Sequence, residues 1–115
     1  MKYLCLIYTD PSGWDKLTPE QREAGMASYM AYGAALKQSN QYVSASRLQP
    51  ASTATVVRVR DGKVSTTDGP FIETKEQLGG YYMIEAKDLN EAIQAASRCP
   101  GAQHGSVEVR PLAEM

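Results

Sequence analysis

Residues 68–82 read DGPFIETKEQLGGYY and contain the most constrained backbone of the chain. Gly69 can adopt a positive φ angle, while Pro70 fixes its own φ angle and pushes the preceding residue out of the helical region. The side chain of Asp68 can accept a hydrogen bond from the backbone two residues further on, as in an Asx turn. We therefore predict a loop with one conformation, and we expect any functional pocket to form around it.

Alternating and apolar stretches on both sides of this loop predict strands. Residues 80–86 hold the aromatic and apolar run that follows the loop. Residues 2–8 are apolar at nearly every position, which is typical of a central strand covered on both faces. The pair Asp61-Gly62 is a strong hairpin signal between two shorter strands. The remaining strands are predicted over residues 42–49, 54–60, 63–66 and 106–110.

Two helices and two turns complete the pattern. Thr18 as N-cap, Pro19 at N1 and Gln21 in a capping box predict a helix over residues 19–39. Asp88 predicts the start of a second helix, which ends at residues 100–101. Turns are predicted at residues 10–13 and 50–52. The expected buried stripes are Met26, Tyr29, Met30, Gly33 and Leu36 in the first helix, and Leu89, Ala92, Ile93 and Ala96 in the second.

The predicted order β-α-β-β(-β)-β-α-β over residues 1–115 indicates one α+β domain, ferredoxin-like with an inserted hairpin. Two helices can cover only one face of such a sheet. Because the strands over residues 2–8 and 81–84 lack a clean polar face, something must cover the second face. We expect a second copy of the chain to do so as a homodimer; the alternative is a long loop folded beneath the sheet.

Composition excludes several classes of function. The 115 residues carry 12 basic and 13 acidic side chains, a balance that favours neither nucleic acid nor an anionic membrane as partner. The apolar run at residues 3–8 is shorter than a signal or membrane segment, so the expected location is the cytoplasm. Two cysteines, Cys5 and Cys99, are too few for a disulfide framework, and we interpret both thiols as structural.

Residues 68–76 closely resemble the signature of the DGPF (DGPFAETKE) family within the YCII-related group, departing from it only at Ile72. The opening MKYLCLIY, RCP at residues 98–100 and GSVEVRP at residues 105–111 resemble the family as well. The resemblance implies a dimeric α+β barrel of ferredoxin-like subunits. It implies no assigned activity; some relatives are linked to sigma-factor-type regulators, and several YCII-related proteins carry a His–Asp pair in a cleft.

The candidate residues for proton transfer are Asp68 and His104. Asp68 could act as a general base or orient one, or it could only satisfy backbone donors in its turn. His104 is the one histidine and could shuttle a proton toward Asp68, or lie in a surface loop. The candidate ligand-binding residues are Phe71, Glu73, Lys75, Tyr81 and Tyr82.

These residues leave three hypotheses open. The charged residues Glu73 and Lys75 could bind a polar substrate or could be solvated at the surface. Tyr81 and Tyr82 must face opposite sides of their strand, so one can pack in the core and the other can reach a pocket. The protein could thus hold a small polar organic ligand and transfer protons, bind a ligand or regulatory partner without turnover, or be a structural dimer. We predict no metal and no cofactor, because no ligand set or nucleotide-binding loop is evident.

Overall fold

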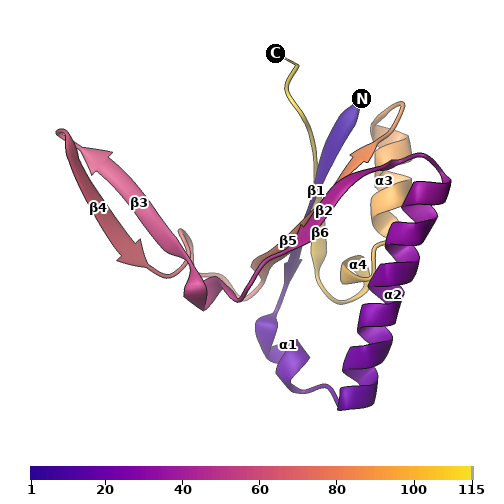
Figure 1. Cartoon of the computed structure of the whole chain (residues 1–115), viewed down its shortest axis with the longest axis horizontal. Helices are drawn as coiled ribbons and strands as arrows, with labels where there is room; N and C mark the ends of the chain where they lie inside the picture. Colours follow the sequence, from indigo (N-terminus) through magenta and orange to yellow (C-terminus); the bar gives the residue numbers. More distant parts are fainter. Residues whose placement is uncertain (115) are drawn as a thin grey trace.

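The computed structural model describes residues 1–114, and its centre is a four-stranded antiparallel sheet (Figure 1). Strand β1 (Lys2–Thr9) lies between β5 (Gln77–Glu85) and β6 (Ser106–Pro111), and β2 (Tyr42–Arg47) pairs with the outer side of β5. The order β2-β5-β1-β6 is the ferredoxin-like arrangement that the sequence predicted. The apolar run of β1 accordingly lies in the interior of the sheet.

The two long helices, α2 (Pro19–Gln38) and α3 (Leu89–Ser97), lie on the same face of the sheet (Figure 1). The capping box of α2 is present as predicted: Thr18 accepts from the backbone of Gln21, and the Gln21 side chain accepts from the backbone of Thr18. Asp88 caps α3 by accepting from the backbone of Glu91. The local signals for both helix starts are therefore confirmed.

Two short helices were not predicted from the sequence. Helix α1 (Pro11–Asp15) begins after Asp10, whose carboxylate accepts from Ser12, so the predicted turn is an N-cap. Helix α4 (Gly101–His104) follows α3 directly, and His104 is its last residue rather than a loop residue. At Gly101 and Gly105 no larger residue fits, because a Cβ atom would lie 2.7 Å from the Ile7 side chain and 2.1 Å from the Tyr8 carbonyl oxygen, respectively.

The core is small, and the inward face of α2 differs from the predicted stripe. Tyr32 and Leu36 are buried and Tyr29 packs against them, whereas Met26 and Met30 are 52% and 76% exposed. The tyrosine rings fill the space over β5, which turns the methionines outward. In α3 the alanines at positions 92, 95 and 96 make the close contact with the sheet, so the prediction of Leu89 and Ile93 as core residues is also wrong.

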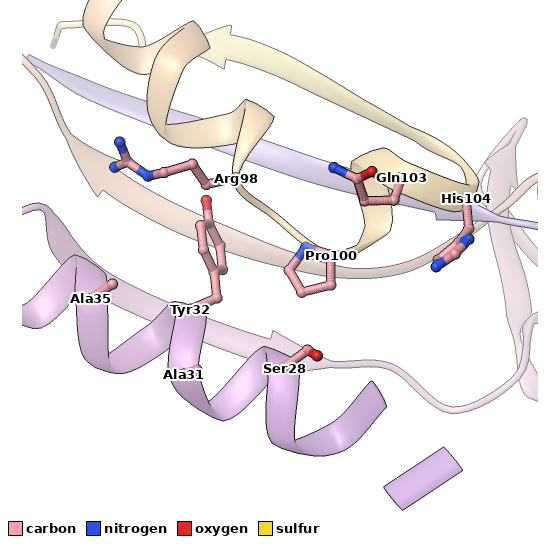
Figure 2. Close-up of a pocket in the computed structure, with 8 residues that line it drawn as sticks. All are labelled: Ser28, Ala31, Tyr32, Ala35, Arg98, Pro100, Gln103 and His104. Atoms are coloured by element: carbon pink, nitrogen blue, oxygen red, sulfur yellow. The ribbon is translucent and has the colours of Figure 1, made fainter. Parts of the chain in front are cut away.

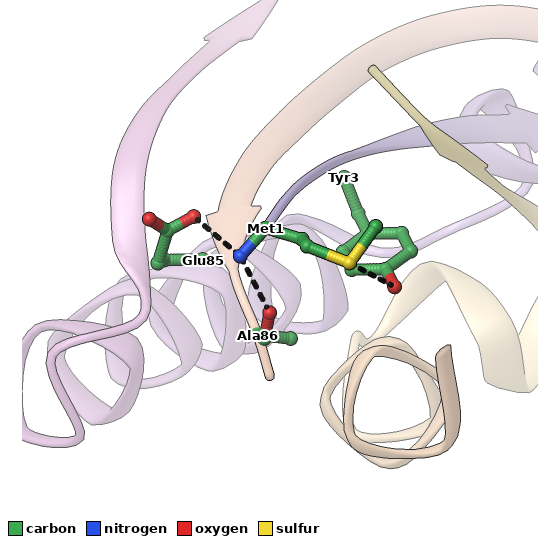
Figure 3. Close-up of polar contacts among 4 residues, drawn as sticks. All are labelled: Met1, Tyr3, Glu85 and Ala86. Atoms are coloured by element: carbon green, nitrogen blue, oxygen red, sulfur yellow. Dashed lines mark hydrogen bonds and ion pairs between the residues drawn. The ribbon is translucent and has the colours of Figure 1, made fainter. Parts of the chain in front are cut away.

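The end of β5 is joined to the start of β1 by the N-terminal ammonium group (Figure 3). This group donates a hydrogen bond of 3.0 Å to the carbonyl of Ala86 and forms an ion pair of 3.5 Å with Glu85. The hydroxyl of Tyr3 donates a weak hydrogen bond to the sulfur of Met1, at 3.9 Å. These contacts hold together the end of the sheet at which β1 begins and β5 ends.

The second face of the sheet, which we call the open face, is covered by neither long helix. Four apolar side chains form its centre: Leu4 lies opposite Met83 and Leu6 opposite Tyr81, and all four are half-buried. The alternating residues of the same strands point to the helices instead; Cys5 is one of them, and its register partners Tyr82 and Val109 share its face. The prediction that β1 is covered on both faces therefore holds on one face only within this subunit.

Strands β3 (Thr55–Arg60) and β4 (Lys63–Asp68) form a separate hairpin that projects away from the sheet on the side opposite the helices (Figure 1). The predicted two-residue turn is confirmed, because Asp61 and Gly62 have φ angles of 53° and 74°. A short 3-10 helix, η1 (Ala51–Thr53), precedes the hairpin. Among the described residues, no helix is long and apolar enough to cross a membrane.

Candidate functional site

A hollow of about 750 Å³ lies where the hairpin returns to the sheet. We call it the signature hollow, since the loop that begins at Asp68 forms one wall and residues 50–52 form another. Its lining residues are Pro11, Pro50, Ala51, Ser52, Asp68, Gly69, Pro70, Glu73, Thr74, Lys75 and Gln77. The hollow is therefore bordered by two carboxylates, one ammonium group, two hydroxyls and an amide.

The backbone around Asp68 is fixed while its carboxylate is free. Gly69 has a φ angle of 101°, the positive value that the sequence allowed for it. Its backbone N–H also donates a hydrogen bond of 2.8 Å to the carbonyl of Ala54. Within residues 1–114, the Asp68 carboxylate forms neither a hydrogen bond nor an ion pair. The interpretation of Asp68 as an acceptor for its own turn is thus not supported by the geometry.

The other end of the loop is tied to the sheet. The Ser106 hydroxyl donates a hydrogen bond of 2.8 Å to the Glu76 carboxylate, and the Thr74 hydroxyl donates to the Glu76 carbonyl. On the neighbouring segment, hydrogen bonds from Ser12 lower the pKa of Asp10, with a smaller contribution from the ammonium of Lys75. These contacts position Lys75 near the start of α1 while its head group borders the hollow.

The structure brings three predicted residues together and leaves a fourth outside. Glu73 and Lys75 line the signature hollow beside Asp68. Phe71 does not; its ring is 77% exposed and lies under the guanidinium of Arg58, 5.7 Å from the ring centroid. The prediction of Phe71 as a ligand contact has no support in this arrangement.

His104 lines a different hollow from Asp68 (Figure 2). This interhelical hollow measures about 500 Å³ and lies between α2 and the segment that contains α4. Figure 2 shows His104 at one end of it and Arg98 at the other, with Pro100 between them. Within one subunit, the predicted Asp68–His104 pair is therefore not assembled around a common cavity.

The two adjacent tyrosines of β5 are separated as their alternation predicts. Tyr82 faces the helices, where its ring stacks at 6.5 Å on Tyr29 and meets Tyr32 edge-on at 5.0 Å. Burial raises the pKa of Tyr82 and raises that of Tyr29 to about 12, so these phenols stay protonated at neutral pH. Tyr81 lies on the open face, and neither tyrosine borders the signature hollow.

Both cysteines are buried and free, as expected for structural thiols. Burial, with a smaller effect of the neighbouring Cys99, raises the pKa of Cys5 to about 11. Among residues 1–114, no group of three or more His, Cys, Asp or Glu side chains is arranged to hold a metal ion. The sequence analysis did not name three polar lining residues as candidates: Ser52, Thr74 and Gln77. Thr74 and Gln77 lie within the stretch 68–82 around which a pocket was expected, and Ser52 lies in the predicted turn at residues 50–52.

Comparison with known proteins identifies the family. The family model of the YCII-related domain matches residues 1–115. The chain belongs to the YCII-related domain family. A relative from Rhizobium meliloti (strain 1021), the uncharacterized protein R00369, is 36% identical to this YCII-related protein over 115 residues, covering 98% of the chain and 93% of the relative.

A solved structure supports the fold assignment. It is 5-chloro-2-hydroxyhydroquinone dehydrochlorinase (TftG) from Burkholderia phenoliruptrix AC1100, in complex with 2,5-dihydroxybenzoquinone. The similarity extends over 100% of this YCII-related chain and 96% of TftG, with a TM-score of 0.59 and 15% sequence identity. At that identity the likeness establishes a common fold.

Proposed function

We propose that this protein binds a small polar organic molecule in the signature hollow and that Asp68 accepts a hydrogen bond or a proton from it. The observation that carries the proposal is the free carboxylate of Asp68 at the border of a hollow of about 750 Å³. Small-molecule sites typically measure about 300–1,000 Å³. A carboxylate that no backbone donor occupies is available to a ligand as a general base or as an orienting group.

The lining of the hollow indicates the class of ligand. Lys75 can neutralise an oxyanion, while Asp68 and Glu73 can accept from hydroxyl groups. A compound with several hydroxyl or carbonyl groups on a small ring matches this set. TftG, which shares the fold, is described in complex with 2,5-dihydroxybenzoquinone. Hydroxylated quinones and hydroquinones are therefore the first compounds to screen.

A pair of matched variants tests the site by thermal shift. Asp68→Asn, at the end of strand β4, and Asp61→Asn, in the hairpin turn before this strand, make the same chemical change, but only Asp68 borders the hollow. A compound that raises the melting temperature of the wild type and of Asp61→Asn, but not of Asp68→Asn, supports the site. Equal shifts for all three proteins would rule out Asp68 as part of the binding site.

Solvent exchange separates catalysis from binding. Proton transfer by Asp68 would exchange an acidic C–H of a bound compound with deuterium from D₂O, and Asp68→Asn would abolish that exchange. Binding without exchange would instead favour the second candidate, a binding or regulatory module. Membership of the DGPF family and a link to sigma-factor-type control, which the resemblance of residues 68–76 implies, remain predictions. A regulatory module of this kind belongs to the second candidate function. His104 has no role in this proposal, because it borders the other hollow.

We also propose that a second copy of the chain covers the open face, giving the dimeric barrel that the sequence predicted. The chain exposes 8316 Å² of surface, whereas a compact monomer of 12.6 kDa exposes about 6,200 Å². The radius of gyration is 16.1 Å, compared with about 13 Å for a compact chain of this length. The surplus exceeds the roughly 800 Å² per partner of a standard interface.

Charge introduced at the centre of the open face tests the dimer. Leu6 is half-buried on this face, so Leu6→Asp should convert a wild-type dimer to monomer in sedimentation velocity. Ala27→Asp, at an exposed position of helix α2 on the other side of the sheet, is the control and should leave the mass unchanged. A wild type that sediments as a monomer across the accessible concentrations would refute this part of the proposal.

A further inference from the structure

The β3–β4 hairpin has one apolar face and one basic face. Successive residues of a strand point to opposite sides, and the register places Val59 directly opposite Val64. Val57 lies on the same face, two residues from Val59. The other face carries the three basic side chains Arg58, Arg60 and Lys63.

Nothing among residues 1–114 covers the apolar face. Val57, Val59 and Val64 are 61%, 56% and 69% exposed, and in the two strands only Val56 is half-buried. A two-stranded hairpin is marginally stable at best when it stands alone in water. A row of exposed valines on such a hairpin therefore indicates that another surface packs against it.

Both uncovered apolar surfaces lie on the same side of the molecule. The hairpin projects from the sheet on the side of the open face, while the long helices α2 and α3 occupy the opposite side (Figure 1). One partner placed against Leu6 and Met83 would thus come between the sheet and the hairpin. The surface of about 2,100 Å² in excess of a compact monomer is large enough for an interface that includes both.

We propose that the hairpin is an arm that packs its valine face on a second copy of this chain. Asp68 is the last residue of β4 and lies on the valine face, opposite Thr55. The copy that covers the valines therefore reaches the border of the signature hollow, and the site is completed only in the dimer. This inference rests on the dimer proposed above. It adds that the hairpin arm, together with the open face of the sheet, stabilises the dimer.

Adjacent residues of β4 provide the test, because they face opposite sides. Val64→Asp places a charge on the valine face, and Ser65→Asp places the same charge on the basic face, where Arg58 lies opposite. Both residues are exposed in the subunit, so neither change should unfold it. Val64→Asp should weaken dimerisation by about tenfold or more in sedimentation velocity, and Ser65→Asp by less than about threefold.

Hydrogen exchange gives a second measure that is independent of any ligand. Backbone amides of residues 55–60 and 63–69 should exchange more slowly as the wild-type concentration rises through the dissociation constant, and should lose this protection in Val64→Asp. Unchanged dimerisation of Val64→Asp, or unchanged exchange in these segments on dimerisation, would overturn the arm. If Leu6→Asp disrupts the dimer and Val64→Asp does not, the interface on the sheet is supported and the role of the hairpin as an arm is refuted. Binding of hydroxyquinones is scored separately by Asp68→Asn, so failure of the ligand site would leave this test unaffected.

Discussion

The hydroxyl of Tyr32 donates a hydrogen bond of 2.8 Å to the backbone carbonyl of Ala95, which joins α2 to α3 in the buried layer above the sheet. The two residues are 63 positions apart in the chain. Ala95 is fully buried, and no water can replace the donor without opening the helix pair. This single bond therefore fixes how the two helices lie relative to each other.

Removal of that hydroxyl should destabilise the fold. Tyr32→Phe leaves the Ala95 carbonyl without its donor and should lower the free energy of unfolding by about 1–2 kcal/mol in urea titrations. Tyr3→Phe is the matched control, because the Tyr3 hydroxyl makes only the weak contact with the Met1 sulfur. A loss for Tyr32→Phe no larger than that for Tyr3→Phe would contradict this account.

Two glycines should respond to alanine with opposite signs. A Cβ atom at Gly105 would lie 2.1 Å from the Tyr8 carbonyl oxygen, so Gly105→Ala must displace backbone and should cost about 2 kcal/mol or more. At Gly33, in the middle of α2, nothing lies within 4 Å of the added atom. Gly33→Ala should stabilise the protein by up to about 1 kcal/mol, as helix propensity predicts. Thermal unfolding of both variants measures these changes. A Gly105→Ala variant as stable as Gly33→Ala would show that the packing at Gly105 is unimportant.

Stability should fall in alkaline solution. Burial raises the pKa of Cys5 from 9.0 to about 11 and that of Tyr29 from 10.0 to about 12. Both groups hold their protons more tightly when folded, so their contribution is complete below pH 9 and is lost as the pH rises toward 12. The double variant Cys5→Ala/Tyr29→Phe should show a shallower decline between pH 9 and 12. A wild-type stability that stays constant over this range would disprove the assignment.

Arg22 should hold α1 in place. Its side chain donates from Nε to the Trp14 carbonyl at 3.1 Å, and its guanidinium lies 5.6 Å from the centroid of the Trp14 ring. Arg22→Gln should cost about 1 kcal/mol and shift the fluorescence of Trp14, the one tryptophan. The guanidinium of Arg47 also lies over this ring, at 5.2 Å, but its side chain is exposed. Arg47→Gln should thus change stability less; an equal loss would indicate that the stacking, and not the hydrogen bond, matters.

Local signals predicted the secondary structure well because each has a short-range physical cause. The capping box at Thr18, the Asp61-Gly62 turn and the apolar run of β1 all appear where the sequence placed them. Residues 10–13 were predicted as a turn and residues 100–101 as the end of a helix, because Pro and Gly occur in both segments. In each segment these residues instead begin or precede a helix of five or four residues.

Tertiary contacts were less accessible to sequence reasoning. The methionines of α2 satisfy a helical period as well as the tyrosines do, and only the aromatic cluster around Tyr82 decides which face turns inward. The grouping of Asp68 with Glu73 and Lys75 followed from their closeness in the chain. The separation of His104 from Asp68 could not be inferred in this way, because it depends on how α4 packs against β1 and β6.

The buried, protonated state of Cys5 and Cys99 has a practical consequence for spectroscopy. Thiol-directed reagents attack the thiolate, so both native sulfurs should react slowly with maleimides at neutral pH. A cysteine introduced on the exposed hairpin, as in Ser65→Cys, can therefore carry a spin label without prior replacement of the native pair. Distances between the two labels of the proposed dimer would report the spacing of its two hairpins.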